Sequence, residues 1–484
     1  MFLTTVWILG WSTTILSCLM IFPALVSFGF SENAVAFSFL FSFGLSLFAG
    51  VGLILTARGS VSIIDTRTTI LLAILSWPTI SLFSCIPFML SGSVESFVDA
   101  YFESISGLVT SGSTIFSNVS DLPKGILFWR GLLQWIGGFA TILLVLSFFS
   151  LAGIGGMNLF HSSMPRSERD TVVHRFWQSM KSLWWVYLTL TVVCAFCLRI
   201  AGMDLFDSVV HAFSTISTGG FSTHSNSISY FNNYAIEIVL IIFMILGALN
   251  FTLYWAFVNG KWKEFFRDGE TIYFFVFLFF SCLIGVVSLI YYSYFTLNDG
   301  IRFAFFNVVS SISTTGFNLY SNDFNTSQQN IFPVLLSLLM LIGGASVSTS
   351  GGVKQLRIIV FFKLTFRELF KLSHPHGVAS INYMGKSIDE KSLRSTWGFL
   401  MTFISLLAVC SIFFGLCGLD LEQSLTLTAV TVSNTGAGLN MIAPELFYFE
   451  MSDTLKWLVI FSQYIGRIEV ILILIVINPI FWRK

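Results

Sequence analysis

The sequence predicts an all-α polytopic membrane protein, in which two initial spans are followed by four span/pore-loop/span repeats around one pseudo-fourfold pore. Three observations support this fold class. Of the 484 residues, 55% are hydrophobic and only 10% are charged, whereas about 25% are charged in an ordinary soluble domain. Apolar stretches recur along the whole chain, and four of the polar connectors end in one short Ser, Thr and Gly motif. A conventional soluble protein is therefore excluded.

A helix needs about 20 apolar residues to cross the hydrocarbon core of a bilayer. An even number of such spans places both termini on one side of the membrane. Most of the 25 Lys and Arg residues lie in the connectors on that side. Because short basic connectors remain in the cytoplasm, both termini are predicted to be cytoplasmic. The ten candidate spans are centred near Ile15, Leu45, Ile80, Val145, Leu190, Ile242, Phe280, Leu339, Leu406 and Val470.

Four connectors on the opposite side share one pattern, a hydroxyl or amide residue and a small residue followed by glycine. We call residues 109–113, 217–221, 313–317 and 433–437 the first to fourth signature segments. Each aligned glycine follows a stretch with the length of a half-helix, at 97–108, 206–216, 301–312 and 422–432. The aligned glycines are Gly112, Gly220, Gly316 and Gly436.

A span lies before each half-helix and another lies after its signature segment. This pattern predicts a two-span N-terminal unit at 1–66 and four pore-loop repeats, at 67–160, 161–262, 263–372 and 373–484. Internal repetition of this kind is the usual sign of a structure built from similar units.

The residue types of the signature segments suit a cation filter. A dehydrated monovalent cation needs oxygen dipoles in place of water, and backbone carbonyls that point to one axis can supply them. Glycine permits the positive φ that such a backbone needs, and each half-helix directs its negative C-terminal end towards the loop. One copy alone could be an ordinary turn, but four copies between spans argue against that reading. The candidate filter residues are Thr110, Ser111, Gly112, Thr218, Gly219, Gly220, Thr314, Thr315, Gly316, Asn434, Thr435 and Gly436.

Residues 343–352 form a run of small and polar residues, apart from Val347, inside the eighth apolar stretch. Close helix packing through small residues is one explanation, but the length of the run favours a flexible loop in the pore. Arg467 and Glu469 lie inside the last apolar stretch. Because a charge at the bilayer centre costs at least about 2.5 kcal/mol, both should face the protein interior or a wet cavity. An ion pair between them is the structural alternative, although residues two apart on a helix do not face each other.

These motifs resemble the Trk/Ktr/HKT superfamily of potassium transporters. The resemblance covers the whole chain and includes Ser-Thr-Gly-Gly-Phe-Ser at 217–222 and the glycine-rich run. It implies that the four aligned glycines mark a potassium filter, with potassium as the transported ligand. The fourth segment matches least well, because Asn434 and Ala437 replace Thr and Phe. By the same resemblance, the gate comprises Gly343, Gly344, Ala345, Ser346, Ser348, Thr349, Ser350, Gly351, Gly352 and Arg467.

The resemblance also implies a homodimer in the bacterial inner membrane and symport of potassium. It further implies a separate cytoplasmic ring of regulatory subunits that carries the nucleotide-binding domains. The sequence contains no Walker motif, so we expect no nucleotide site in this chain, and we expect no nucleic-acid partner.

Two other functions remain as alternatives. A secondary carrier for another cation or a small organic solute would have repeats of opposite topology and charged substrate-binding residues, whereas the four repeats here share one orientation. A membrane enzyme would need a cluster of His, Asp or Cys facing a cavity, and the sequence shows none.

Overall fold

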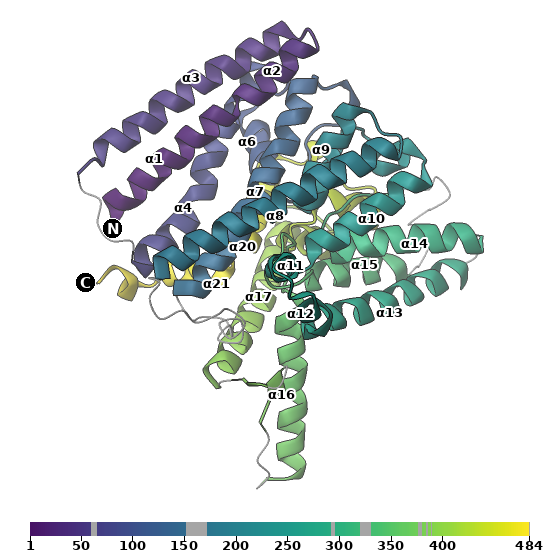
Figure 1. Cartoon of the computed structure of the whole chain (residues 1–484). Helices are drawn as coiled ribbons and strands as arrows, with labels where there is room; N and C mark the ends of the chain where they lie inside the picture. The colour runs from purple at the N-terminus through teal and green to yellow at the C-terminus, as the bar shows by residue number, and fades with distance from the viewer. Residues whose placement is uncertain are drawn as a thin grey trace.

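The computed structural model describes residues 1–59, 65–151, 172–291, 296–319, 331–375, 380–383, 386–388 and 390–483. Its helices pack side by side in one bundle, and α16 projects from one end (Figure 1). The longer helices are α1 Phe2–Leu19, α2 Ile21–Gly29, α3 Asn33–Thr56, α4 Thr66–Ser84, α6 Phe97–Leu108, α7 Lys124–Leu151, α8 Val172–Ile200, α9 Leu205–Ile216, α10 Tyr234–Ala248, α11 Phe251–Val258, α13 Gly269–Tyr291, α14 Leu297–Ile312, α15 Ile331–Ile342, α16 Gln355–Ser373, α17 Glu390–Leu416, α18 Leu421–Val432, α20 Asp453–Ile468 and α21 Val470–Ile477.

The remaining elements are short. They are the helices α5 Ile86–Leu90, α12 Trp262–Arg267 and α19 Leu439–Ile442, the 3-10 turns Val119–Asp121, Ser227–Phe231, Gly436–Gly438, Tyr448–Glu450 and Pro479–Trp482, and the strands β1 Asn382–Tyr383 and β2 Lys386–Ser387. The two strands form a small antiparallel hairpin between α16 and α17.

The described residues contain seven helices that are long and apolar enough to cross a membrane, and nine such spans if each of two bent helix pairs counts as one. Large apolar side chains stand exposed on the outside of the bundle. On α3 they include Phe37, Phe41 and Phe48, which is 83% exposed. Exposed apolar area on this scale marks a surface that contacts lipid or another protein. The chain is a helical polytopic membrane protein, as the composition predicts.

Three of the ten predicted spans are not continuous helices, which corrects the sequence-based expectation. The stretch near Ile242 is broken between α10 and α11, which meet at an angle of 95°, and the stretch near Val470 is broken between α20 and α21, at 97°. The stretch near Leu339 yields the 12-residue helix α15, whose length of about 18 Å is well short of a bilayer core of about 30 Å.

The first break is stabilised by backbone hydrogen bonds to the glycine-rich run. The Ala345 N–H donates to the Ala248 carbonyl oxygen, and the Phe251 N–H donates to the Val347 carbonyl oxygen, each at 2.8 Å. Asn250 begins α11 by accepting from the Thr252 N–H at 3.0 Å. Because irregular backbone at membrane depth is tolerated only where its polar groups are satisfied, the run and the break support each other.

The four predicted half-helices are present as α6, α9, α14 and α18. Each begins at a polar N-cap residue, and each ends inside the bundle at a signature segment. The third begins at Leu297 rather than at residue 301, because the Thr296 side chain caps it by accepting from the Asp299 N–H. Asp420 and Gln423 form a capping box at the start of α18.

Candidate ion pathway

All four half-helices end in the same turn. The first residue after each C-cap, Thr110, Thr218, Thr314 or Asn434, has a left-handed backbone with φ between 52° and 56°. The next N–H donates back to a carbonyl five residues earlier at 2.8–2.9 Å. This is the Schellman turn, in which glycine usually occupies the left-handed position. Three threonines in this conformation, at about 1–2 kcal/mol each, indicate that the surrounding structure imposes it.

Positive φ at the aligned glycines was expected in all four segments, and the structure shows it in three. Gly112, Gly220 and Gly316 have φ of 75°, 80° and 82°. Gly436 does not share this conformation, because it begins a 3-10 turn that ends at Gly438. The expectation is therefore wrong for the fourth segment, which also departs most from the shared sequence pattern.

The four signature segments adjoin one another in chain order. A β-carbon at Gly112 would overlap the Gly219 carbonyl oxygen, and one at Gly220 would overlap the Thr315 carbonyl oxygen. A β-carbon at Gly316 would lie 2.8 Å from the Gly438 nitrogen, and one at Gly436 would overlap the Ser113 hydroxyl of the first segment. These contacts close a ring, and they bring together residues that are more than 300 positions apart.

Ala437 lies towards the middle of this ring. Its β-carbon would be 2.8, 2.8 and 3.0 Å from β-carbons built on the first three aligned glycines. The Ala437 N–H donates to the Ser111 carbonyl oxygen at 3.0 Å. The fourth segment thus contacts the first segment, and the ring is narrow where Ala437 lies.

The glycine-rich run 343–352 lies directly beside the signature segments and is largely buried. The Gly351 N–H donates to the Thr314 hydroxyl at 2.7 Å. The Thr349 hydroxyl donates to the Ile216 carbonyl oxygen at 3.0 Å and to the Gly247 carbonyl oxygen at 3.1 Å. The run is therefore an ordered loop that contacts the ends of two half-helices.

Arg467 reaches this loop from α20. Its Nη2 donates to the Thr349 carbonyl oxygen at 3.0 Å and its Nε donates to the Thr141 hydroxyl at 2.7 Å. The residue is only 6% exposed, which agrees with the expectation that it faces the interior. No ion pair with Glu469 is found among the described residues; Glu469 pairs with Arg357 at 2.7 Å instead. The two side chains diverge because Glu469, with φ of 71°, is the break between α20 and α21.

Three glycines identify the positions in the other repeats that are equivalent to Arg467. A β-carbon at Gly137, Gly247 or Gly466 would lie against the last carbonyl of the half-helix before it, at Leu108, Ile216 or Val432. These glycines therefore occupy matching places, and the residues that follow them are Gly138, Ala248 and Arg467. A single charged side chain stands where the matching positions are small.

Two charged residues at the loop were not singled out from the sequence. Lys354 donates from Nζ to the Ser350 carbonyl oxygen. The buried Glu270 carboxylate accepts from the Ser346 N–H and hydroxyl at 2.8 and 2.9 Å, and from the Leu356 N–H at 3.2 Å. Glu270 stands at the edge of an apolar stretch, and this position of an acidic residue was the available signal.

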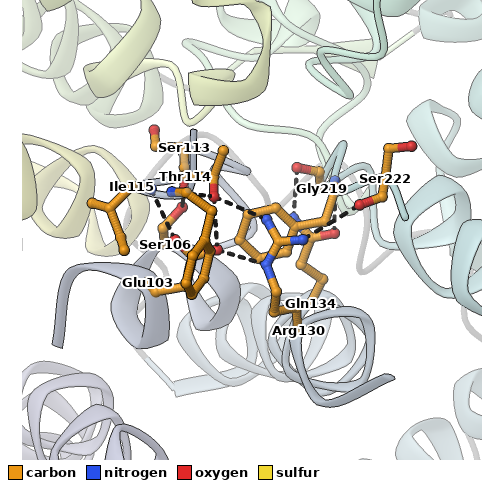
Figure 2. A network of polar contacts seen from close by, with 11 residues as sticks. Glu103, Ser106, Ser113, Thr114, Ile115, Arg130, Gln134, Gly219 and Ser222 are labelled. Carbon is orange, nitrogen blue, oxygen red and sulfur yellow. Dashed lines mark hydrogen bonds and ion pairs between the residues drawn. The ribbon is translucent and has the colours of Figure 1, made fainter. Parts of the chain in front are cut away.

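A second buried network, behind the first two signature segments, was also missed. Figure 2 shows Glu103 and Arg130 in contact with Thr114, directly after the first segment, and Gln134 in contact with Gly219 of the second segment. The available signal was an acidic residue inside a half-helix and an arginine near the start of the next apolar stretch.

Comparison with known proteins agrees with this architecture. The family model described as TrkH, cation transport protein, matches residues 36–481. The chain is 34% identical to the Trk system potassium uptake protein TrkH of Vibrio parahaemolyticus, over 99% of this chain and 98% of the relative. It is also 34% identical to TrkH of Escherichia coli K12, with the same coverage. It is 31% identical to TrkG of that organism, over 98% of this chain and 97% of the relative.

The crystal structure of the potassium transporter TrkH from Vibrio parahaemolyticus has the same fold. It aligns with a TM-score of 0.91 at 33% sequence identity and covers 100% of both chains. The resemblance seen in the sequence is thereby confirmed, and since the family consists of transport proteins, the chain is not an enzyme. The chain belongs to the TrkH family of cation transport proteins.

Proposed function

We propose that this chain takes up potassium across the bacterial inner membrane as the channel-like translocating subunit of a Trk-type system. The observation that carries the proposal is the ring of four signature segments, each held by the same helix-ending turn, with a loop packed against the ring and an arginine bonded to that loop. The relatives are named as potassium uptake proteins.

In this proposal, the ring is the selectivity filter. Backbone carbonyls of residues 110–112, 218–220, 314–316 and 434–436 replace the water of a dehydrated potassium ion. Four half-helices end at the ring, and each C-terminus is equivalent to about half a negative charge. Their combined field favours a cation over an anion at the centre.

The loop 343–352 and Arg467 form the gate. The loop bonds to the ends of two half-helices through Thr349 and Gly351, which supports a position across the exit from the filter. Arg467 holds the loop through the Thr349 carbonyl and adds a positive charge that repels a passing cation. Transport then requires that these hydrogen bonds break together.

The partners follow from the family resemblance. We propose a homodimer with both termini in the cytoplasm, where a ring of nucleotide-binding regulatory subunits docks on the basic connectors. The α16 helix begins at the gate loop and projects from the bundle (Figure 1). It can therefore transmit movement from such a partner to the loop.

Reconstitution of the purified chain in liposomes tests the proposal. Rubidium uptake down a gradient should be slowed by potassium and much less by the same concentration of sodium. Uptake that required a gradient of an organic solute would support the secondary-carrier alternative. If empty liposomes and liposomes with the protein took up rubidium equally, the transport proposal would be wrong.

A further inference from the structure

A fully buried ion pair lies behind the first signature segment. Glu103 is on α6 and Arg130 is on α7; the Arg130 Nε is 2.6 Å from the Glu103 Oε1, and the side chains are 2% and 0% exposed. Two unpaired charges would be very costly at this depth, but a hydrogen-bonded pair is stable as long as both partners stay in place. The pair is therefore a rigid point in the structure.

This pair binds Thr114 and Ile115, in the chain that follows Gly112. Glu103 accepts from the Ile115 N–H at 3.0 Å and from the Thr114 hydroxyl at 3.1 Å. Arg130 donates to the same hydroxyl from Nη2 at 3.1 Å. The two residues that directly follow the first segment therefore cannot shift without breaking bonds to buried charges.

Arg130 also reaches the second signature segment. Its Nη1 donates to the Ser222 carbonyl oxygen at 3.3 Å, and its guanidinium lies 4.1 Å from the centre of the Phe221 ring. Figure 2 shows Arg130 between the two segments, with Glu103 on one side and Ser222 on the other. One guanidinium thus joins the chain that directly follows the first segment to the end of the second segment.

Gln134, one helical turn after Arg130, holds the second segment on both sides of Gly220. Its Nε2 donates to the Gly219 carbonyl oxygen at 2.7 Å, and its Oε1 accepts from the Phe221 N–H at 3.1 Å. The side chain is fully buried. Both ends of one amide are used, so the orientation of the Gly219 to Phe221 backbone is fixed by a residue outside the segment.

The other half-helices lack this ion pair. The positions that match Glu103, nine residues before each aligned glycine, hold His211, Asn307 and Leu427. Of the positions that match Gln134, three residues before Gly247, Gly343 and Gly466, the first two hold Met244 and Met340, and the third holds Gln463, which donates to the Ser113 hydroxyl at 2.7 Å. Among the described residues, a carboxylate–guanidinium pair at these positions is thus found only in the first repeat, whereas a matching amide also holds the first segment from the fourth repeat.

We propose that Glu103, Arg130 and Gln134 are positioning residues that set the spacing of the first two signature segments and thereby the preference for potassium over sodium. This inference rests on the proposed function of the ring as a filter. Sodium is the smaller ion and needs its oxygens closer together. A clamp that keeps two of the four segments from moving inwards therefore disfavours sodium more than potassium.

The test compares sodium competition in liposomes that contain the whole chain. Gln134→Leu removes both hydrogen bonds and keeps the approximate volume, and Arg130→Lys keeps the charge but cannot reach both segments. Arg302→Gln is the matched control, because Arg302 pairs with Glu237 between α14 and α10 and, in the part of the chain that the structure describes, donates to Glu237 and Asn232 rather than to a signature segment. The measured quantity is the sodium concentration that halves rubidium uptake, which does not depend on the amount of folded protein.

We expect this sodium concentration to fall by roughly tenfold in Gln134→Leu, because the two buried hydrogen bonds that hold the second segment are lost, and to fall in Arg130→Lys as well. Arg302→Gln should match the parent. If Arg130→Lys does not fold, Gln134→Leu alone decides the matter. An unchanged value in Gln134→Leu, or an equal fall in Arg302→Gln, would overturn the inference. A parent chain that takes up no rubidium would instead overturn the proposed function itself.

Discussion

Arg467 donates a hydrogen bond from Nη2 to the carbonyl oxygen of Thr349 across 3.0 Å. The bond joins the last long helix of the chain to the glycine-rich loop, and Thr349 in turn donates to the carbonyl oxygen of Ile216 at the end of α9. A half-helix, a loop and a buried charge thus form one connected unit. Removal of any member should affect the other two.

Gly112→Ser should relax selectivity towards sodium. Gly112 has φ of 75°, which opposes a side chain, and a β-carbon there would overlap the Gly219 carbonyl oxygen. The substitution must therefore displace a carbonyl of the neighbouring segment. Sodium should compete with rubidium uptake at a lower concentration, by about tenfold if roughly 1.4 kcal/mol of discrimination is lost. Gly92→Ser is a control, because Gly92 also has positive φ but has open space around it. Equal competition in Gly112→Ser and the parent would remove Gly112 from the filter.

Shortening the loop should raise flux without any regulatory partner. Deletion of residues 347–350 removes the Thr349 bonds to α9 and to Arg467, so the closed arrangement loses its main contacts. The measurement is initial rubidium uptake per folded molecule in liposomes. A folded deletion variant that transports no faster than the parent would indicate that the run serves helix packing alone.

Glu469→Gln should affect transport less than any change at Arg467. Glu469 is paired with Arg357 and is 37% exposed at its side chain, and partly exposed ion pairs are worth about 1 kcal/mol or less. We expect a loss of stability of that size and rubidium uptake within about twofold of the parent. Thermal unfolding in detergent, together with uptake, gives both values. A change in uptake as large as that of Arg467→Ala would mean that the two residues act together after all.

The sequence predicts the half-helices well, because they have polar caps and a repeated end. The range 97–108 is the helix α6 to the residue, and 422–432 misses α18 by one residue at its start. Composition and span length predict the membrane class equally directly. The helix caps, the repeated helix ends and the apolar spans are each recorded in a short stretch of sequence, so local pattern is enough to predict them.

The breaks in the spans could not be predicted in the same way. Leu249 and Asn250 lie in a stretch with ordinary apolar composition, and their break is stable only because Ala345 and Val347 supply partners from almost 100 residues away. The Glu103 to Arg130 pair is likewise a contact between two helices, and no periodicity within either helix reveals it. Tertiary hydrogen bonds decide both features, and a sequence pattern does not record them.

Arg467→Ala should raise potassium flux, because the arginine places a positive charge where the matching positions hold Gly138 and Ala248. Across about 6 Å at an effective dielectric constant of about 20, one positive charge repels another by roughly 3 kcal/mol. This corresponds to about a hundredfold in rate if the charge acts fully at the barrier. Screening by water should reduce the gain considerably. Loss of the bond to Thr349 should add to it by loosening the loop.

Arg467→Lys separates the two contributions. Lysine keeps the positive charge but is a compact donor that cannot bond to Thr349 and Thr141 in the same fork geometry. If charge dominates the barrier, the lysine variant should transport little faster than the parent. If the bond to the loop dominates, it should resemble the alanine variant. Thr141→Val is a useful control, because it removes the other partner of Arg467 and leaves the charge and the loop bond in place. The measurement is initial rubidium uptake normalised to folded protein. Unaltered flux per molecule in both Arg467 variants, with less folded protein, would make Arg467 a structural residue that has no part in the gate.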